Sequence, residues 1–215
     1  DLFDEESVAA IFDRYLLLLR AVVADPAGAI GDIDLLTATE KRELVVRSTG
    51  RTISAPAATL VDLFAAQAAA TPRNTALIDA ESDTRLDYRE FAARVNVLAR
   101  ALIGRGIGPG TVVAVAMRRC VDLPVTLYAV HAAGAAYLPL DPEYPVERIR
   151  AVLTTAWPSA VVTRPGDETN LPNEVPVWSI TDLEGECADP APVTDADRIR
   201  PLHPDALAYL IYTSG

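Results

Sequence analysis

The chain of 215 residues is long enough for one full domain, or for one domain and a piece of another. Hydrophobic residues make up 50% and charged residues 23%, which excludes the disordered, collagen-like and coiled-coil classes. Its 19 Lys and Arg against 30 Asp and Glu give a net charge of −11, which argues against nucleic acids and anionic membranes as partners. A local basic pair, Arg118 and Arg119, can still meet a small phosphate.

The cysteines, the histidines and the apolar runs argue against a disulfide-rich, a zinc-binding and a membrane-spanning protein. Cys120 and Cys187 make at most one pair, which is no disulfide framework and favours a reducing cytoplasm. Together with His131 and His203 they are too widely spaced for a recognisable zinc site, so no metal ligands are expected. The longest apolar runs fall far below the roughly 18 residues of a membrane span. With no starting Met and no signal peptide, the sequence is expected to be cut from a longer protein.

The N-terminal region predicts one amphipathic helix followed by a linker. Apolar residues from Val8 to Val23 recur at three- and four-residue spacing, so they form a stripe that needs a partner. The segment Asp25–Gly28 ends that helix, because proline cannot continue the hydrogen-bond ladder. Residues 29–58 lack a sustained period and are predicted as linker, with a short helix near 38–47.

From residue 59 helices and strands alternate, which is typical of an α/β domain with a largely parallel sheet. Asp87 and Glu90 have the spacing of a capping box at a helix start. The run 111–117 is apolar on both faces and suits a central parallel strand. The predicted helices are 60–70, 87–104, 121–133 and 147–155, the predicted strands are 75–79, 111–117, 136–140, 160–163, 175–180 and 206–212, and 181–205 is predicted as loop.

Two glycine-containing segments are candidates for phosphate binding, and the sequence supports only the second. The array from Gly104 to Gly110 follows a helix and precedes a strand, which is the wrong context for a dinucleotide fingerprint and indicates a helix-ending turn. The last residues, Thr213, Ser214 and Gly215, leave a predicted strand into a hydroxyl- and glycine-rich loop. Such a loop offers unobstructed N–H groups and hydroxyls to a polyphosphate, although an ordinary strand-to-turn exit has the same appearance.

Three segments in order resemble the first core motifs of adenylation domains from nonribosomal peptide synthetases. Leu86–Phe91 is similar to the first motif, Ala133–Pro142 is very similar to the second, and Leu207–Gly215 is similar to the opening half of the third. Upstream, Phe12–Tyr15 and Asp34–Thr37 resemble the last helix of a condensation domain and the linker that follows it. The resemblance implies a condensation-domain helix over 1–28, a linker over 29–58 and the N-terminal part of an adenylation domain over 59–215, cut inside its phosphate-binding loop.

That resemblance implies an enzyme that forms an aminoacyl adenylate from an amino acid and ATP with Mg²⁺. A carrier-domain phosphopantetheine thiol then takes the aminoacyl group. The family's third motif contacts the ATP phosphates, so Thr213, Ser214 and Gly215 are the expected nucleotide-binding residues. Donors near the pyrophosphate leaving group stabilise its developing charge. No catalytic residue carries over, because the other family motifs lie beyond residue 215, and the fragment alone is expected to be inactive.

Two alternatives stay open beside this interpretation. The small residues Ala132–Ala136 could offer a knob to the aromatic side chains of an MbtH-like partner, or they could simply be buried in a helix. The early motifs are also partly shared with ligases that activate acyl or aryl acids.

His131 and Ala132 stand where the second motif usually has an apolar residue followed by lysine. His131 is interpreted as a packing or surface residue, and His203 is interpreted as a loop residue.

Overall fold

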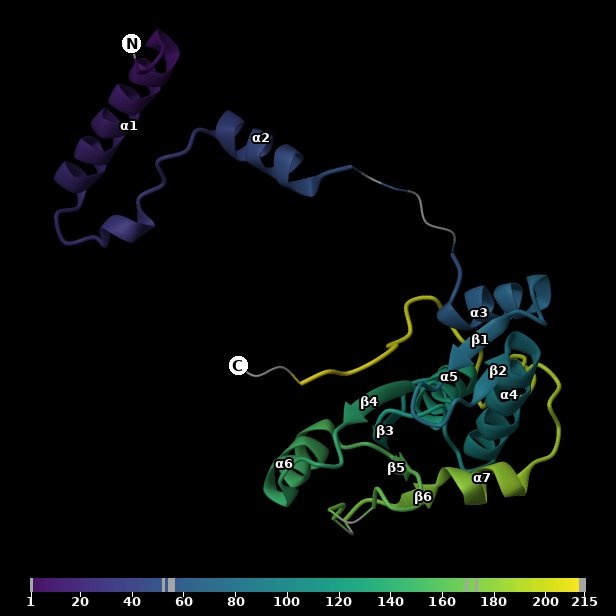
Figure 1. Cartoon of the computed structure of the whole chain (residues 1–215). Helices are drawn as coiled ribbons and strands as arrows, with labels where there is room; N and C mark the ends of the chain where they lie inside the picture. The colour runs from purple at the N-terminus through teal and green to yellow at the C-terminus, as the bar shows by residue number, and fades with distance from the viewer. Residues whose placement is uncertain (1, 52, 54–56, 169, 173, 213–215) are drawn as a thin grey trace. The chain divides into compact units, whose positions relative to one another are not determined.

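The computed structural model describes residues 2–51, 53, 57–168, 170–172 and 174–212, and the chain divides into two compact units, Asp1–Pro56 and Ala57–Gly215 (Figure 1). Each unit is described by itself. Within the residues that the structure describes, no helix combines the length and apolarity required to span a bilayer.

The first unit consists of α1 (Glu5–Ala24), a short 3-10 turn η1 (Ile30–Asp32) and α2 (Ala38–Thr49). Both predicted helices are confirmed. Asp4 caps α1 by accepting a hydrogen bond from the Ser7 N–H, and Thr37 with Glu40 forms the capping box of α2. An ion pair between Arg14 and Glu40 joins the two helices. No residue of α1 or α2 is buried, so the apolar stripe of α1 has no partner among the described residues of its unit.

The second unit is an α/β domain around a four-stranded parallel sheet of order β4-β3-β5-β6, as predicted, beside a small antiparallel pair β1-β2. Its elements in chain order are α3 (Leu60–Ala70), β1 (Thr75–Ile78), β2 (Arg85–Asp87), α4 (Tyr88–Gly104), β3 (Val112–Ala116), α5 (Asp122–Ala133), β4 (Ala136–Leu140), α6 (Val146–Ala156), β5 (Ala160–Thr163), β6 (Val177–Ser179) and α7 (Ile180–Glu186).

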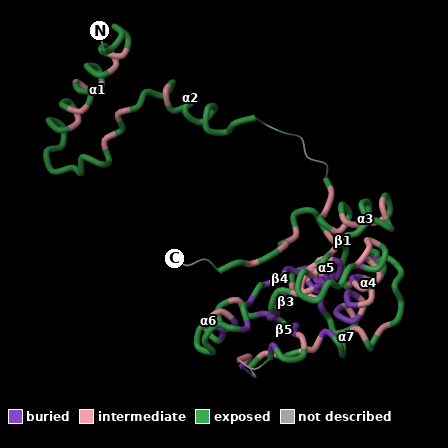
Figure 2. Tube along the Cα trace, viewed as in Figure 1, coloured by how far each residue is buried: buried purple, intermediate pink, exposed green. Residues whose placement is uncertain are grey.

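Helices cover both faces of this sheet. Val113 and Val115 of β3 pack with α4 and α5 in one core cluster, while Ala114 and Ala116 pack with α6 in another. Alternate side chains of a strand point to opposite faces, so a run that is apolar at every position is what a doubly covered strand requires. Figure 1 shows α6 on the opposite side of the sheet from α4 and α5, and Figure 2 places the buried residues in these layers.

Helix α4 begins and ends as the sequence predicts. Asp87 accepts a hydrogen bond from the Glu90 N–H at 2.7 Å, and the Glu90 carboxylate accepts one from the Asp87 N–H at 3.0 Å. After the helix, Gly106 and Gly110 have φ of +84° and +87°, which confirms the helix-ending turn. Gly134 closes α5 in the same way with φ +92°.

Three predictions about secondary structure are wrong. The short strand β2 was not predicted, and residues 180–186 form α7 where a loop had been expected from 181. Residues 206–212 form no strand, and the described part of this segment makes one parallel bridge, Tyr137 with Tyr209. Tyr137 donates to the Ala208 carbonyl and accepts from the Leu210 N–H. The next donor toward this edge would come from Pro139, which has no N–H, so the ladder stops.

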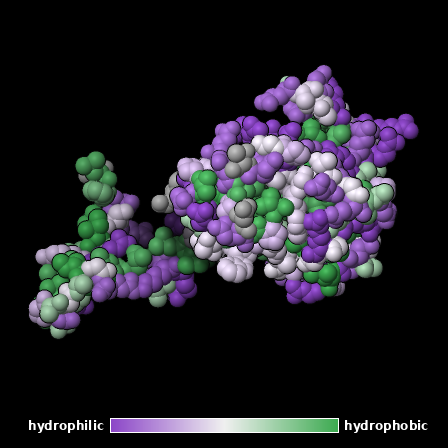
Figure 3. All heavy atoms as spheres, turned by 90° about the horizontal axis from the view of Figure 1, so that it is seen from below, coloured by the Kyte–Doolittle hydropathy of each residue, from purple (hydrophilic) through white to green (hydrophobic). Residues whose placement is uncertain are grey.

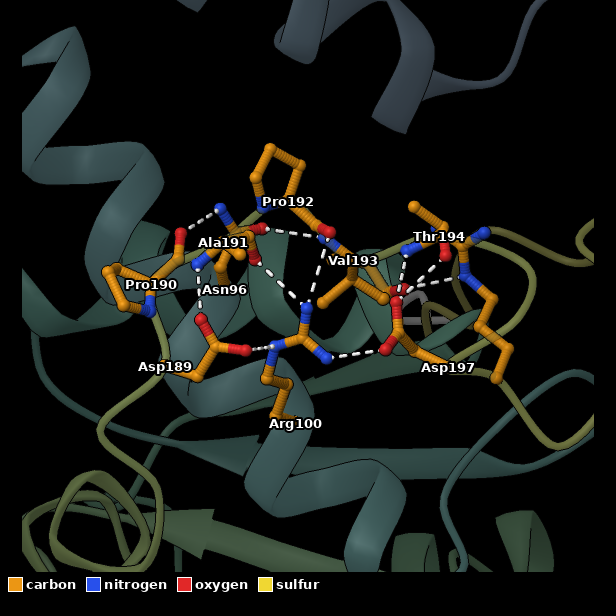
Figure 4. A network of polar contacts seen from close by, with 11 residues as sticks. Asn96, Arg100, Asp189, Pro190, Ala191, Pro192, Val193, Thr194 and Asp197 are labelled. Carbon is orange, nitrogen blue, oxygen red and sulfur yellow. Dashed lines mark hydrogen bonds and ion pairs between the residues drawn. The ribbon is translucent and has the colours of Figure 1, made fainter.

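The segment after α7 is held against α4 by Arg100 and by Asn96, whose side-chain amide donates to the Pro190 carbonyl at 3.0 Å. Arg100 pairs with Asp197 at 2.6 Å and with Asp189 at 3.4 Å (Figure 4). Its guanidinium also donates to the carbonyls of Ala191 and Pro192. Because these contacts join residues almost a hundred positions apart, the loop returns along the helix to the sheet edge where Tyr209 lies.

Candidate functional site

A cavity of about 450 Å³ opens at the carboxyl ends of β3 and β4. We call it cavity A. In open parallel sheets, ligands bind outside the carboxyl ends of the strands, and this position is therefore where a ligand is expected. Cavity A is lined by Val115, Met117, Arg118, Arg119, Leu123, Pro139, Leu140, Asp141, Glu143, Tyr144, Arg148, Val152, Ile211 and Tyr212.

Arg118, which lines cavity A, is held by a buried carboxylate. Asp167 is 4% exposed and accepts hydrogen bonds from the Arg118 backbone N–H at 3.0 Å and from its Nε at 2.6 Å. A buried charge requires such pairing. The pair joins the end of β3 to the turn after β5, and it holds the Arg118 side chain beside the cavity while leaving it 58% exposed.

The opposite wall is built by the turn that follows β4. Asp141 accepts a hydrogen bond from the Glu143 N–H at 2.9 Å, and its carbonyl accepts one from Tyr144 at 3.1 Å. Helix α6 starts directly after this turn. The Arg148 guanidinium carbon lies 4.5 Å from the centre of the Tyr144 ring, a cation–π contact that keeps the charge at the wall.

The expected nucleotide-binding residues Thr213, Ser214 and Gly215 lie outside the described residues. Ile211 and Tyr212, which precede them directly in sequence, line cavity A. The segment from Tyr209 is anchored to β4 by its bridge to Tyr137 and by stacking of the two rings at 5.7 Å. The predicted phosphate-binding residues therefore follow a segment that is attached to the wall of the cavity. Their role stays a prediction.

Several residues of the first two motifs pack into the core, whereas Pro139, Leu140 and Asp141 of the second motif line cavity A. Phe91 is 4% exposed in the core, whereas Tyr88 is only half-buried. The knob proposed for Ala132–Ala136 is wrong, because Ala132, Ala133, Ala135 and Ala136 are between 0% and 3% exposed. The Arg198 Nε–H also donates to the Ala132 carbonyl. The alternative, alanines buried at a helix end, is correct, since Ala132 and Ala133 belong to the core that α4 and α5 share.

The two histidines carry no base–nucleophile arrangement in the described chain. His131 stacks edge-to-face on Tyr137 at 5.2 Å, and burial lowers its pKa, so the ring is neutral at pH 7. His203 is exposed and lies 3.4 Å from Asp205. Both positions agree with the packing and loop roles predicted for them. Among the described residues, no group of three or more His, Cys, Asp or Glu is placed to hold a metal ion.

The sequence pointed to Arg118 and Arg119, but it did not point to Tyr144, Arg148 or Asp167. The available signal was position, because charged residues directly after a predicted parallel strand gather at one edge of the sheet. Arg148 and Asp167 are brought there by α6 and by the turn after β5, which only the tertiary fold reveals.

A doubly covered parallel sheet with a cationic cavity at its carboxyl edge is typical of α/β proteins that bind nucleotides or phosphates. The family model described as AMP-binding enzyme matches residues 64–215. The chain belongs to this family.

The curated relatives are peptide synthetases. A dimodular nonribosomal peptide synthase of Bacillus subtilis is 38% identical over 100% of this chain and 9% of its own length. Enterobactin synthase component F of Escherichia coli is 37% identical over 99% of the chain and 16% of its own length. The chain thus spans a small part of these relatives.

Solved structures of a peptide synthetase and of a related protein are also similar to this chain. The nonribosomal peptide synthetase FmoA3 in its AMPPNP-bound form has a TM-score of 0.73 and 30% identity, covering 99% of this chain and 22% of that one. The N-terminal subdomain of Klebsiella oxytoca NpsA has a TM-score of 0.63 and 25% identity, covering 73% of this chain and 39% of that one.

Proposed function

We propose that the chain is part of a modular nonribosomal peptide synthetase. It would comprise the end of a condensation domain, a linker and the N-terminal part of an adenylation domain. The observation that carries this proposal is the extent of the similarity. The family model covers residues 64–215, whereas the synthetase relatives align over 99% to 100% of the chain and so include the first unit.

In the complete domain the amino-acid carboxylate would attack the α-phosphorus of ATP, and the bond to the leaving pyrophosphate would break. A phosphopantetheine thiol of a carrier domain would then attack the adenylate carbonyl and release AMP. Magnesium accompanies ATP and neutralises part of the triphosphate charge. Cavity A supports this reaction, because it offers three guanidiniums beside the segment that leads to Thr213.

Exchange of radiolabelled pyrophosphate into ATP tests the proposal. We expect background exchange from the 215-residue chain with every amino acid, and amino-acid-dependent exchange from a longer polypeptide of the same gene that carries the whole domain. Exchange by the 215-residue chain itself would contradict the prediction that this fragment is inactive. Absence of exchange from the longer polypeptide with all amino acids would overturn adenylation of an amino acid.

An acid-activating ligase is the second candidate, because the NpsA N-terminal subdomain has been solved in complex with 3-hydroxybenzoyl-AMSN and covers 76% of this chain at 26% identity. Aryl acids and coenzyme A therefore belong in the same assay. Exchange with an aryl acid and formation of its coenzyme A thioester would favour this candidate over the peptide synthetase.

A further inference from the structure

We propose that Arg119 and Arg148 of cavity A form a binding site for the phosphate groups of a reactant. This inference rests on the proposed function and extends it from the third motif to Arg119, in the segment after β3, and to Arg148 of α6. The two arginines come from segments about thirty positions apart, and both line the same cavity. Thr213, Ser214 and Gly215 are not needed for the argument.

The charge of the cavity supports an anionic ligand. Its lining carries the arginines 118, 119 and 148 against the carboxylates Asp141 and Glu143, a local excess of positive charge in a chain whose net charge is −11. Like charges gathered in a concave site raise the local concentration of a counter-ion. A small phosphate therefore meets a favourable local potential here.

The three arginines differ in how much charge they can offer. Arg118 is committed through its Nε to the buried Asp167 at 2.6 Å. In the described part of the chain, Arg119 and Arg148 make no ion pair with a carboxylate. The Arg148 guanidinium stacks on Tyr144, which holds the group in place and leaves its N–H donors free for a ligand. Guanidinium forks match phosphate oxygens, and such contacts are charge-assisted.

Two phosphorylated reactants of the proposed reaction share this chemistry, the triphosphate of ATP and the phosphate of phosphopantetheine. We expect pyrophosphate to bind more tightly than phosphopantetheine, because its higher charge can meet both free arginines. The position of Tyr212 in the same lining agrees with this order, since the predicted ATP-phosphate loop follows it in sequence.

The test is calorimetric titration of the 215-residue chain with inorganic pyrophosphate and, separately, with phosphopantetheine. We expect Arg119→Ala and Arg148→Ala each to raise the Kd for pyrophosphate about fivefold to tenfold, as for the loss of a charge-assisted contact. Arg150→Ala is the matched control. Arg150 lies on the same helix, pairs with Glu147 and Glu174, and lines a different cavity. Its Kd should stay within about twofold.

Arg118 is left unchanged in this test, because removing it would strand the buried Asp167 and unfold the site. The circular dichroism melting curve of each variant serves as the folding control. Arg119→Lys, which retains the charge, should recover part of the binding lost in Arg119→Ala.

No pyrophosphate binding by the wild-type chain up to about 10 mM would overturn the proposal. Equal weakening in all three alanine variants would also overturn it, since that pattern reflects net charge alone. Tighter binding of phosphopantetheine would keep the phosphate site and reject ATP as its source. If the longer polypeptide shows amino-acid-dependent exchange while both arginine variants bind like the wild type, this inference fails and the proposed function stands. If pyrophosphate binding depends on the two arginines but the longer polypeptide shows no exchange, this inference stands and the proposed function fails.

Discussion

Helices α1 and α4 have the same kind of sequence and different surroundings. Each has apolar residues at three- and four-residue spacing, and each begins with an aspartate cap. Six residues of α4 are buried, but none of α1 is, and Val8, Phe12 and Tyr15 are 53%, 59% and 54% exposed. Figure 2 shows this contrast, and Figure 3 shows hydrophobic atoms on the surface of the first unit, at the left. Periodicity therefore identifies an apolar face, but not what covers it.

The largest expected effect is the loss of unfolding free energy when an apolar side chain is truncated in α4 rather than in α1. Leu98→Ala removes a side chain that is 0% exposed and should lower the free energy of unfolding by about 2–5 kcal/mol. Phe12→Ala should change it by less than about 0.5 kcal/mol. Urea unfolding followed by tryptophan fluorescence reports the stability of the second unit in both variants, because Trp157 and Trp178 belong to that unit. A loss for Phe12→Ala as large as that for Leu98→Ala would show that α1 packs on the second unit.

A pair of glycines sharpens the contrast between constrained and free backbone. Gly134 has φ +92°, and a Cβ there would lie 2.8 Å from the Pro109 ring, so Gly134→Ala should cost about 2 kcal/mol. Gly104→Ala is the control, because a Cβ there meets nothing within 4 Å and α4 would gain about 0.5 kcal/mol. Equal melting temperatures for the two variants would contradict the left-handed turn at Gly134.

Removing one capping box from each unit should have smaller effects on the free energy of unfolding. Asp87→Ala removes the acceptor of the Glu90 N–H and should destabilise the second unit by about 1 kcal/mol. Thr37→Ala removes the same motif from α2 and should leave that fluorescence transition unchanged. Loss of helical circular dichroism without a shift in the transition is the expected signature of the Thr37 variant. A shifted transition would mean that α2 and the second unit unfold together.

The smallest effect concerns pH. The Thr194 backbone N–H and the Arg100 guanidinium lower the pKa of Asp197 to about 2. Since the unfolded carboxyl titrates near 3.9, its contribution to stability is complete above that pH and is lost as the pH falls toward 2. Carboxyl NMR titration should find the low value, and Arg100→Leu should raise it. An unchanged pKa in the variant would exclude the ion pair in solution.

The parallel sheet could be predicted because its strands carry their own signals. The predicted bounds of β4 and β5 agree with the structure, since both are apolar runs between clear helix ends. Strand β2 has only three residues and owes its existence to pairing with β1, which no local pattern reveals. Helix α7 begins inside a segment predicted as strand, where the buried Ile180 and Leu183 satisfy either period.

The candidate site was predictable only where it is local in sequence. The Thr213–Gly215 motif and the basic pair Arg118–Arg119 could be read from the sequence alone. The placement of Arg148 in the lining of cavity A depends on α6 and on the turn at Asp141 that precedes it. The burial of Asp167 depends on β5 lying beside β3. These are properties of packing, for which the sequence carries no short-range signal.

Pro139 has a consequence for how such chains behave at high concentration. It lies on the outer side of β4, where Tyr137 offers one amide to a neighbouring segment and the next position offers none. A sheet edge that presents a full row of amides recruits strands from other molecules and starts aggregation. A single proline interrupts that row. The chemistry of one residue therefore makes the edge of β4 less open to intermolecular β-pairing.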